Sequence, residues 1–195
     1  MTHSRTRGLA AALPLVLLTL AAGCAGGQGA APPPTDSPAD EWIMPPGAEV
    51  PDMTISIYQG AEAVGGDEVR LSQVLGQGKP VVLNFWAALC PPCRAEMPEL
   101  QAVHAARGNE VTVLGIDIGP QQHLGTRDQG RELLQELGVH FPAGTTFNEN
   151  VALDYRLLVM PSTLFIYPDG SLLRTWTGPL TESKLNDLID EMLEG

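Results

Sequence analysis

The chain has 195 residues, with 23 acidic and 11 basic side chains and a formal net charge of −12 at neutral pH. This length suffices for one domain with additional segments at its ends. The acidic balance argues against a nucleic-acid-binding function and against adsorption of the folded part to anionic lipid headgroups.

The first residues have the pattern of an export signal. Arg5 and Arg7 make a basic start, and an apolar stretch of 12 residues follows at 9–20. Small residues at 21–23 then provide a cleavage site. Because a membrane-spanning helix needs about 20 apolar residues, we predict a signal peptide over residues 1–23. A retained anchor helix is the alternative.

The run Ala21-Ala22-Gly23-Cys24 after a leucine-rich stretch resembles a bacterial lipobox. In such proteins the signal peptidase cuts before the cysteine, which then carries the lipid. The count of three cysteines agrees with this interpretation, because lipidation of Cys24 removes the unpaired one. The alternative is an ordinary secretory signal with a free thiol. We expect an exported protein, anchored by lipid to a bacterial membrane with its domain outside the cytoplasm.

Residues 24–49 are rich in Gly, Ala and Pro and lack the apolar periodicity of a core. We predict a flexible tether here, with a root-mean-square span of about 25–30 Å. The folded domain is expected over residues 50–195, and we expect it to be a monomer. All 23 acidic residues lie after Cys24 and two of the 11 basic residues lie before it, so a processed chain would have a net charge of −14.

Apolar periodicity and turn residues predict the elements of this domain. In chain order we expect a strand at 54–58, a short helix at 71–75, a buried strand at 81–86, a helix at 92–106 kinked at Pro98, a buried strand at 111–117, a helix at 127–137, a short helix at 148–155, strands at 164–167 and 172–176 joined by the turn Pro168-Asp169-Gly170, and a helix at 180–193 capped by Thr181.

The run Cys90-Pro91-Pro92-Cys93 lies where the strand at 81–86 gives way to a helix. Two cysteines three positions apart can close a disulfide and reopen it. A helix N-terminus favours a thiolate over a thiol, because unpaired backbone N–H groups and the helix dipole stabilise an anion. The motif therefore predicts a site of thiol–disulfide exchange. A permanent structural disulfide is the alternative; a zinc site needs four ligands, and no second Cys or His pair has suitable spacing, so no metal is expected.

Several motifs in a fixed order resemble those of the membrane-tethered TlpA/ResA-like thiol–disulfide oxidoreductases, which have a thioredoxin fold. They are Asn84-Phe85-Trp86-Ala87, the pair Cys90 and Cys93, the run from Arg94 to Leu100, Met160-Pro161-Ser162-Thr163, and Pro168-Asp169-Gly170. The resemblance implies an α/β fold with a central mixed β-sheet flanked by helices and an N-terminal β extension. The chain departs from the family at Leu89, where a tryptophan is usual, which concerns partner docking more than chemistry.

The resemblance also implies roles for individual residues. Cys90 is expected to attack and Cys93 to resolve the mixed disulfide. Pro161 resembles the family's cis-proline, which lets the Met160 backbone pair with an extended substrate. Trp86 is expected beneath the disulfide.

Glu96 follows Cys93 by about one helical turn, and in ResA-like relatives the acid at this position influences cysteine reactivity. It is a candidate to accept the proton of Cys93; the alternative is a solvated surface glutamate. Glu99 and Arg94 are expected at the surface. His104, His123 and His140 do not cluster in the sequence and are expected to be structural or solvated.

Pro91 and Pro92 carry no N–H, so two donors that would stabilise the Cys90 thiolate are missing. We hypothesise a mild stabilisation of the thiolate and a reducing disulfide. Together with Trp86, Leu89, Met160 and Pro161, these two prolines are expected to border the client-binding surface.

The leading hypothesis is a reductase that takes electrons from a membrane thiol–disulfide partner and reduces exported client proteins, such as apocytochrome c thiols or thiols of copper sites. An oxidase that forms disulfides is the alternative. A peroxiredoxin-like peroxidase would carry a threonine at the position of Ala87, and a copper-binding module would recruit His140. No nucleotide, flavin or haem motif is present, so no cofactor beyond the redox-active disulfide is expected.

Overall fold

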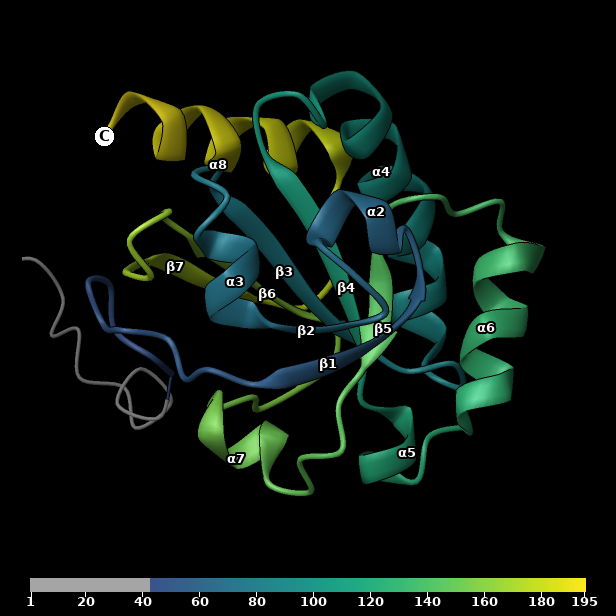
Figure 1. The fold of residues 1–195 in the computed structure, drawn as a ribbon. Helices are drawn as coiled ribbons and strands as arrows, with labels where there is room; N and C mark the ends of the chain where they lie inside the picture. The colour runs from purple at the N-terminus through teal and green to yellow at the C-terminus, as the bar shows by residue number, and fades with distance from the viewer. Residues whose placement is uncertain (1–42) are drawn as a thin grey trace, which may run out of the picture. The chain divides into compact units, whose positions relative to one another are not determined.

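The computed structural model describes residues 43–195, and the predicted signal peptide, Cys24 and the tether up to residue 42 lie outside the described residues. The elements are β1 (Thr54–Gln59), α2 (Ala61–Val64), β2 (Glu68–Arg70), α3 (Leu71–Leu75), β3 (Val81–Trp86), α4 (Pro91–Arg107), β4 (Thr112–Asp117), α5 (Gly119–Gln122), α6 (Arg127–Glu136), β5 (Ala143–Thr145), α7 (Val151–Asp154), β6 (Ser162–Ile166), β7 (Leu172–Thr177) and α8 (Glu182–Glu194) (Figure 1). Within this range, no helix combines the length and the hydropathy needed to span a bilayer.

The strands form one mixed sheet in the order β2-β1-β5-β4-β3-β6-β7. The pairs β3–β4 and β4–β5 are parallel, and the other pairs are antiparallel. Strand β3 lies inside the sheet, and all six of its residues are buried, which explains its continuous apolar run. The hairpin of β1 and β2 is the expected N-terminal β extension. The predicted fold class is confirmed.

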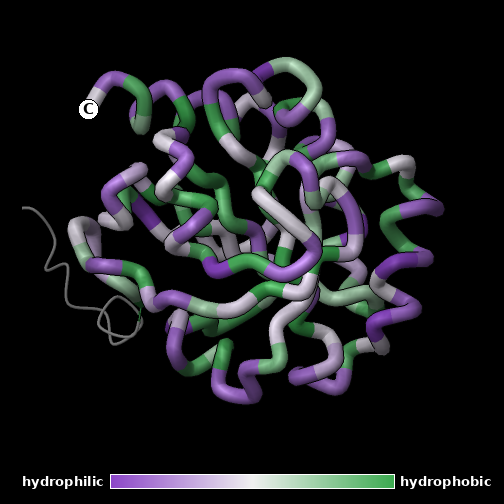
Figure 2. Tube along the Cα trace, viewed as in Figure 1, coloured by the Kyte–Doolittle hydropathy of each residue, from purple (hydrophilic) through white to green (hydrophobic). Residues whose placement is uncertain are grey.

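Each face of the sheet has its own hydrophobic core. Helices α4, α6 and α8 pack on the face that carries Val82, Trp86 and Phe165. Helices α2, α3 and α7 pack on the opposite face, with Leu83 and Phe85. Figure 2 shows hydrophobic and hydrophilic residues alternating along α6 and α8, as expected of helices with one buried side.

Four short elements were not predicted: α2, β2, α5 and β5. Strand β5 has only three residues, and it exists because it pairs with both β4 and β1. Its Gly144 leaves no room for a side chain, since a Cβ there would overlap the carbonyl of Ser56. Helices α2 and α5 have four residues each, a length at which local signals are weak. The helix predicted at 148–155 is shorter than expected, because only 151–154 are helical.

The ordered chain begins before residue 50, earlier than the predicted boundary. Met44 is buried, and the backbone of Gly47 donates to the carbonyl of Leu172 at 2.6 Å. Glu49 forms a β-bridge with Ser171. At least the last residues of the predicted tether are thus part of the folded unit.

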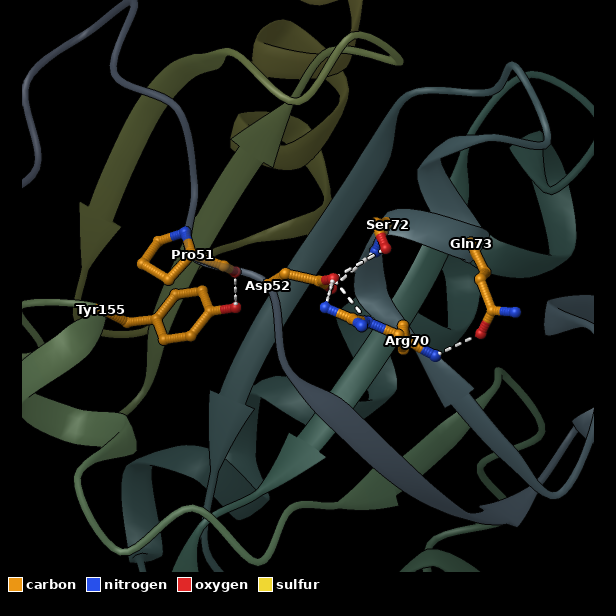
Figure 3. A network of polar contacts seen from close by, with 6 residues as sticks. All are labelled: Pro51, Asp52, Arg70, Ser72, Gln73 and Tyr155. Carbon is orange, nitrogen blue, oxygen red and sulfur yellow. Dashed lines mark hydrogen bonds and ion pairs between the residues drawn. The ribbon is translucent and has the colours of Figure 1, made fainter.

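A polar network holds this N-terminal segment against α3 and α7 (Figure 3). Asp52 accepts hydrogen bonds from the backbone N–H of Ser72 at 3.0 Å and from its hydroxyl at 2.8 Å. It also forms an ion pair with Arg70. On the other side, the hydroxyl of Tyr155 donates to the carbonyl of Pro51. These contacts bind residues 51–52 to the face of the sheet opposite α4.

Candidate active site

The two cysteines form a disulfide at the start of α4, directly after the loop that follows β3. Their Cα atoms are 5.3 Å apart. Cys90 is the N-cap residue of α4, and its Sγ accepts a hydrogen bond from the backbone N–H of Cys93 at 3.4 Å. Because the two intervening residues are prolines, Cys93 provides the first backbone N–H of the helix that can stabilise a thiolate at Cys90.

Cys90 is the more accessible of the two cysteines. Cys90 is 6% exposed and Cys93 is 1% exposed, so a client disulfide meets Cys90 first. Trp86 is fully buried at the end of β3 and belongs to the same core cluster as both cysteines.

A second segment reaches the disulfide from a distant part of the sequence. The carbonyl oxygen of Met160 lies 3.8 Å from the Sγ of Cys90. The peptide bond between Met160 and Pro161 is cis, as the resemblance implied. The hydroxyl of Ser162 donates to the carbonyl of Val159 at 2.7 Å and holds the turn before β6. The turn thereby places a backbone carbonyl beside the sulfur of Cys90.

Glu96 is buried in the interior, so the alternative of a solvated surface glutamate is wrong. Its side chain is 2% exposed and lies between α4, β3 and the segment before α8. Oε1 accepts a hydrogen bond from Nδ2 of Asn84 at 2.6 Å, and Oε2 accepts one from the backbone N–H of Leu180 at 2.7 Å. Burial raises the pKa of Glu96 to about 7, and the two hydrogen bonds oppose this shift.

Asn84 connects Glu96 to the neighbouring strand. Its Nδ2 also donates to the hydroxyl of Thr163 at 2.9 Å, while its Oδ1 has no hydrogen-bond partner among the described residues. A half-turn of the amide would present Oδ1, an acceptor, to Glu96. Asn84 can therefore donate to an ionised Glu96 or accept from a protonated one.

Exposed apolar side chains lie next to Cys90 in the sequence and in the segment that ends at Met160. Leu89 is 55% exposed, and Leu158 and Val159 are also exposed beside the half-buried Met160. Between α5, α7 and this turn lies a pocket of about 80 Å³, lined by Ile118, Gln122, Ala152 and residues 157–160. The sequence analysis singled out Leu89 and Met160 but missed Leu158 and Val159, because hydropathy does not show which apolar residues lie outside the core.

The remaining candidates lie outside this centre. Arg94 forms an ion pair with Glu136 at 2.7 Å, and Glu99 accepts the backbone N–H of Glu182 at 2.9 Å, at the start of α8. His123 and His140 are exposed and His104 is half-buried. In the part of the chain that the structure describes, no group of three or more His, Cys, Asp or Glu side chains is placed to hold a metal ion.

Two buried polar residues of the strands were missed in the sequence analysis as site residues. Thr163 in β6 contacts Asn84, and Asp117 ends β4. The sequence did contain a sign of Asp117, because a carboxylate in the apolar run at 111–117 is buried and must therefore have hydrogen-bond partners inside the protein.

Comparisons with known proteins agree with this geometry. The model of the AhpC/TSA family matches residues 46–174. Thiol-disulfide oxidoreductase ResA of Oceanobacillus iheyensis is 32% identical, over 78% of this chain and 76% of that protein. Thiol:disulfide interchange protein HelX of Rhodobacter capsulatus is 30% identical, over 69% of this chain and 72% of that protein. The exposed lipoprotein thioredoxin Etrx1 of Streptococcus pneumoniae has a similar structure, with a TM-score of 0.58 and 22% identity over 72% of this chain and 99% of that one. The chain therefore belongs to the AhpC/TSA family and is a thioredoxin-like thiol–disulfide oxidoreductase of the ResA type.

Proposed function

We propose that the protein is an exported, lipid-anchored reductase that transfers two electrons from the Cys90–Cys93 dithiol to disulfides of client proteins. The observation that carries the proposal is the arrangement of three groups. Cys90, the more accessible cysteine, lies at the N-terminus of α4; the Met160 carbonyl lies 3.8 Å from its sulfur; and the buried carboxyl of Glu96 lies one turn beyond Cys93. Cys90 attacks the client, the Met160 backbone aligns it as an extended segment, and Glu96 accepts a proton.

The reaction proceeds through two exchanges. The Cys90 thiolate attacks one sulfur of the client disulfide, forms a mixed disulfide and releases the other client sulfur as a thiolate. Cys93 then loses its proton and attacks Cys90, which forms the intramolecular disulfide and releases the first client sulfur. The client gains two electrons and, from solvent and Glu96, two protons.

Glu96 is suited to accept the proton of Cys93. Its pKa of about 7 means that the carboxylate and the carboxylic acid are both populated at neutral pH. Asn84 can satisfy either form through its donor or its acceptor atom. When Glu96 takes up the proton, its new O–H group can therefore find an acceptor in Asn84.

Clients are expected to bind as extended segments along the Met160 backbone, with apolar side chains on Leu89, Leu158 and Val159. Apocytochrome c thiols and thiols of metal sites are the proposed clients, and a membrane thiol–disulfide protein is the proposed electron donor. The basic and apolar N-terminal residues, the cysteine at position 24 and the likeness to an exposed lipoprotein support the anchor.

The direction of electron flow is tested by the reduction potential of the Cys90–Cys93 pair. The full-length protein in detergent would be equilibrated in graded thiol buffers, with tryptophan fluorescence as the probe. A potential near or below about −250 mV supports a reductase. A potential of about −120 to −180 mV would mean that the protein is an oxidase or isomerase.

Replacing Pro92 by alanine is expected to make the pair more oxidising. The variant adds an N–H at the second position of α4, from which an N-cap side chain can accept a hydrogen bond. We expect a lower pKa of the Cys90 thiol and a potential that rises by about 30 mV, which corresponds to about a tenfold change in the exchange constant. Pro91→Ala is the matched control, because an N–H at the first position points away from the cap. Equal shifts in both variants would contradict the explanation.

Replacing Leu89 by alanine is expected to weaken client docking without loss of stability. The side chain is 55% exposed, so the free energy of unfolding should change by less than about 0.5 kcal/mol. The rate with a small disulfide such as oxidised glutathione should be unchanged, while the reduction of insulin slows severalfold. Leu193→Ala, another exposed leucine near the C-terminus, should affect neither rate. An unchanged insulin rate in Leu89→Ala would remove Leu89 from the docking surface.

A further inference from the structure

A second buried carboxyl, that of Asp117, lies near the active site and has no part in the reaction described above. Asp117 is the last residue of β4 and pairs in the parallel register with Trp86, the last residue of β3. Its side chain is fully buried. A buried carboxylate is costly unless several groups satisfy it, so its contacts indicate what it holds in place.

The contacts of Asp117 come from four different elements. Oδ1 accepts the backbone N–H of Gly119 at 2.9 Å, at the start of α5. Oδ2 accepts the hydroxyl of Tyr58 in β1 at 3.3 Å, and the backbone carbonyl accepts the hydroxyl of Thr145 in β5 at 2.7 Å. Helix α6 meets the carboxyl at Gly130, where a Cβ would overlap Oδ2. The surrounding elements therefore pack closely against this side chain.

Two nearby guanidinium groups favour the ionised form of Asp117. Burial raises its pKa to about 6, while its hydrogen bonds and the guanidinium groups of Arg127 and Arg131 lower it. Arg131 in turn lies over the ring of Tyr58. The carboxyl is thus ionised above neutral pH and bonded on both oxygens.

Residues 118–124, which include the Gly119 bound to Asp117, are hydrogen-bonded to residues 86–89, the segment just before Cys90. The N–H of Ile118 donates to the carbonyl of Trp86 at 2.9 Å. The N–H of Leu124 donates to the carbonyl of Gly119 at 2.9 Å, and the carbonyl of Leu124 accepts the N–H of Leu89 at 2.9 Å. Residues 86–89 are therefore bonded at both ends to residues 118–124, the loop in which the N–H of Gly119 is bound to Asp117.

The packing between these two segments is tight. A Cβ at Gly119 would lie 3.2 Å from the Cβ of Ala87, and a Cβ at Gly125 would lie 3.0 Å from the Cβ of Ala88. Cys90 follows at once, and its N–H donates to the carbonyl of Ala87 at 3.2 Å. A shift of the α5 loop would be passed directly to Cys90.

We propose that Asp117 is a positioning residue for Cys90: by accepting the N–H of Gly119, its carboxyl fixes the α5 loop and thereby holds residues 86–89, so that the sulfur stays within reach of the Cys93 N–H. The four-residue helix α5 is too short to be stable by itself, and the hydrogen bond from Gly119 to Asp117 fixes its first residue. This inference rests on the proposed function, because it concerns the same nucleophile.

The test compares Asp117→Ala with Asp117→Asn in the full-length protein in detergent. The readout is the pKa of the Cys90 thiol, obtained from the pH dependence of its alkylation by iodoacetamide, with the modified residue identified by mass spectrometry. Asp117→Ala removes the acceptor of the Gly119 N–H, so we expect the Cys90 pKa to rise by about 1 unit and alkylation at neutral pH to slow by up to about tenfold. Asp117→Asn retains an acceptor for Gly119 and should leave the Cys90 pKa within about 0.3 units of the parent.

Two further variants keep the test decisive. Val74→Ala removes a buried side chain in α3, on the opposite face of the sheet, and should lower stability without moving the Cys90 pKa. If Asp117→Ala fails to fold, Gly130→Ala disturbs the same carboxyl from the side of α6, because its Cβ would overlap Oδ2 of Asp117.

The proposal is overturned if folded Asp117→Ala leaves the Cys90 pKa unchanged, if Asp117→Asn shifts it as much as Asp117→Ala, or if Val74→Ala shifts it equally. Alkylation needs no client. Failure of the parent protein to reduce disulfides would therefore reject the proposed function separately, and would leave the measured pKa values valid.

Discussion

Replacing Cys93 by serine is expected to leave the protein covalently bound to its clients, whereas replacing Cys90 by serine abolishes exchange. In Cys93→Ser the more accessible Cys90 still attacks, but no thiolate is available to resolve the mixed disulfide. In Cys90→Ser the attacking atom is a hydroxyl, which is not ionised at neutral pH, so the rate of insulin reduction should fall by about a thousandfold or more.

The measurement is made on full-length protein, with insulin turbidity for the rate and non-reducing electrophoresis with mass spectrometry for the trapped clients. Cys24→Ser serves as the control, because Cys24 is the proposed site of the lipid anchor and has no part in the proposed exchange, so its exchange rate in detergent should equal that of the parent. The mechanism is wrong if Cys90→Ser retains activity, or if Cys93→Ser captures no client in cells.

Replacing Glu96 by glutamine is expected to change both the exchange reaction and the pH dependence of stability. In the parent, the rate of the resolving step should rise with pH through about pH 7, as Glu96 becomes the carboxylate that accepts the proton of Cys93. Glutamine cannot accept this proton, so the rise disappears and the mixed disulfide accumulates. General acid–base catalysis typically contributes about 10²-fold or more, which sets the expected loss in the resolving step.

The stability effect has a defined sign. Below the ordinary pKa of 4.5 the carboxyl is protonated in the folded and the unfolded chain, and it carries no penalty. Between 4.5 and about 7 the unfolded chain releases a proton that the folded chain retains, so the folded parent loses stability as the pH rises. A shift of this size corresponds to about 3 kcal/mol at and above pH 8, and Glu96→Gln should lack this loss.

Urea unfolding between pH 4.5 and pH 8 measures the stability effect, and stopped-flow mixing with a client disulfide measures the resolving step. Glu99→Gln is the matched control, since Glu99 lies about one turn further along α4, is half-buried and contacts α8 instead of Asn84. Its pH profiles should follow those of the parent. A Glu96→Gln variant with the parent's pH profile and no mixed disulfide would show that Glu96 takes no part in proton transfer.

Strong local patterns predicted much of this protein correctly. The bounds of β3 and α3 follow directly from apolar runs and turn residues, and α4 begins at Pro91, one residue before its predicted start at Pro92. The place of the cysteine pair at a strand-to-helix junction, and hence the class of chemistry, needs only neighbours in the sequence. Such features depend on interactions within a few residues, which is why they can be recognised without the fold.

Other features arise only when distant segments meet. Strand β5 and helix α5 are too short to form without their partners, and Met160 reaches Cys90 across 70 positions of the sequence. The sequence by itself determined the reactive pair, the central strand and the family resemblance. The tertiary structure decided that Glu96 is buried against Asn84 and Leu180, because the surroundings of a helical residue are set by what packs on that side of the helix, and its raised pKa is a consequence of that burial.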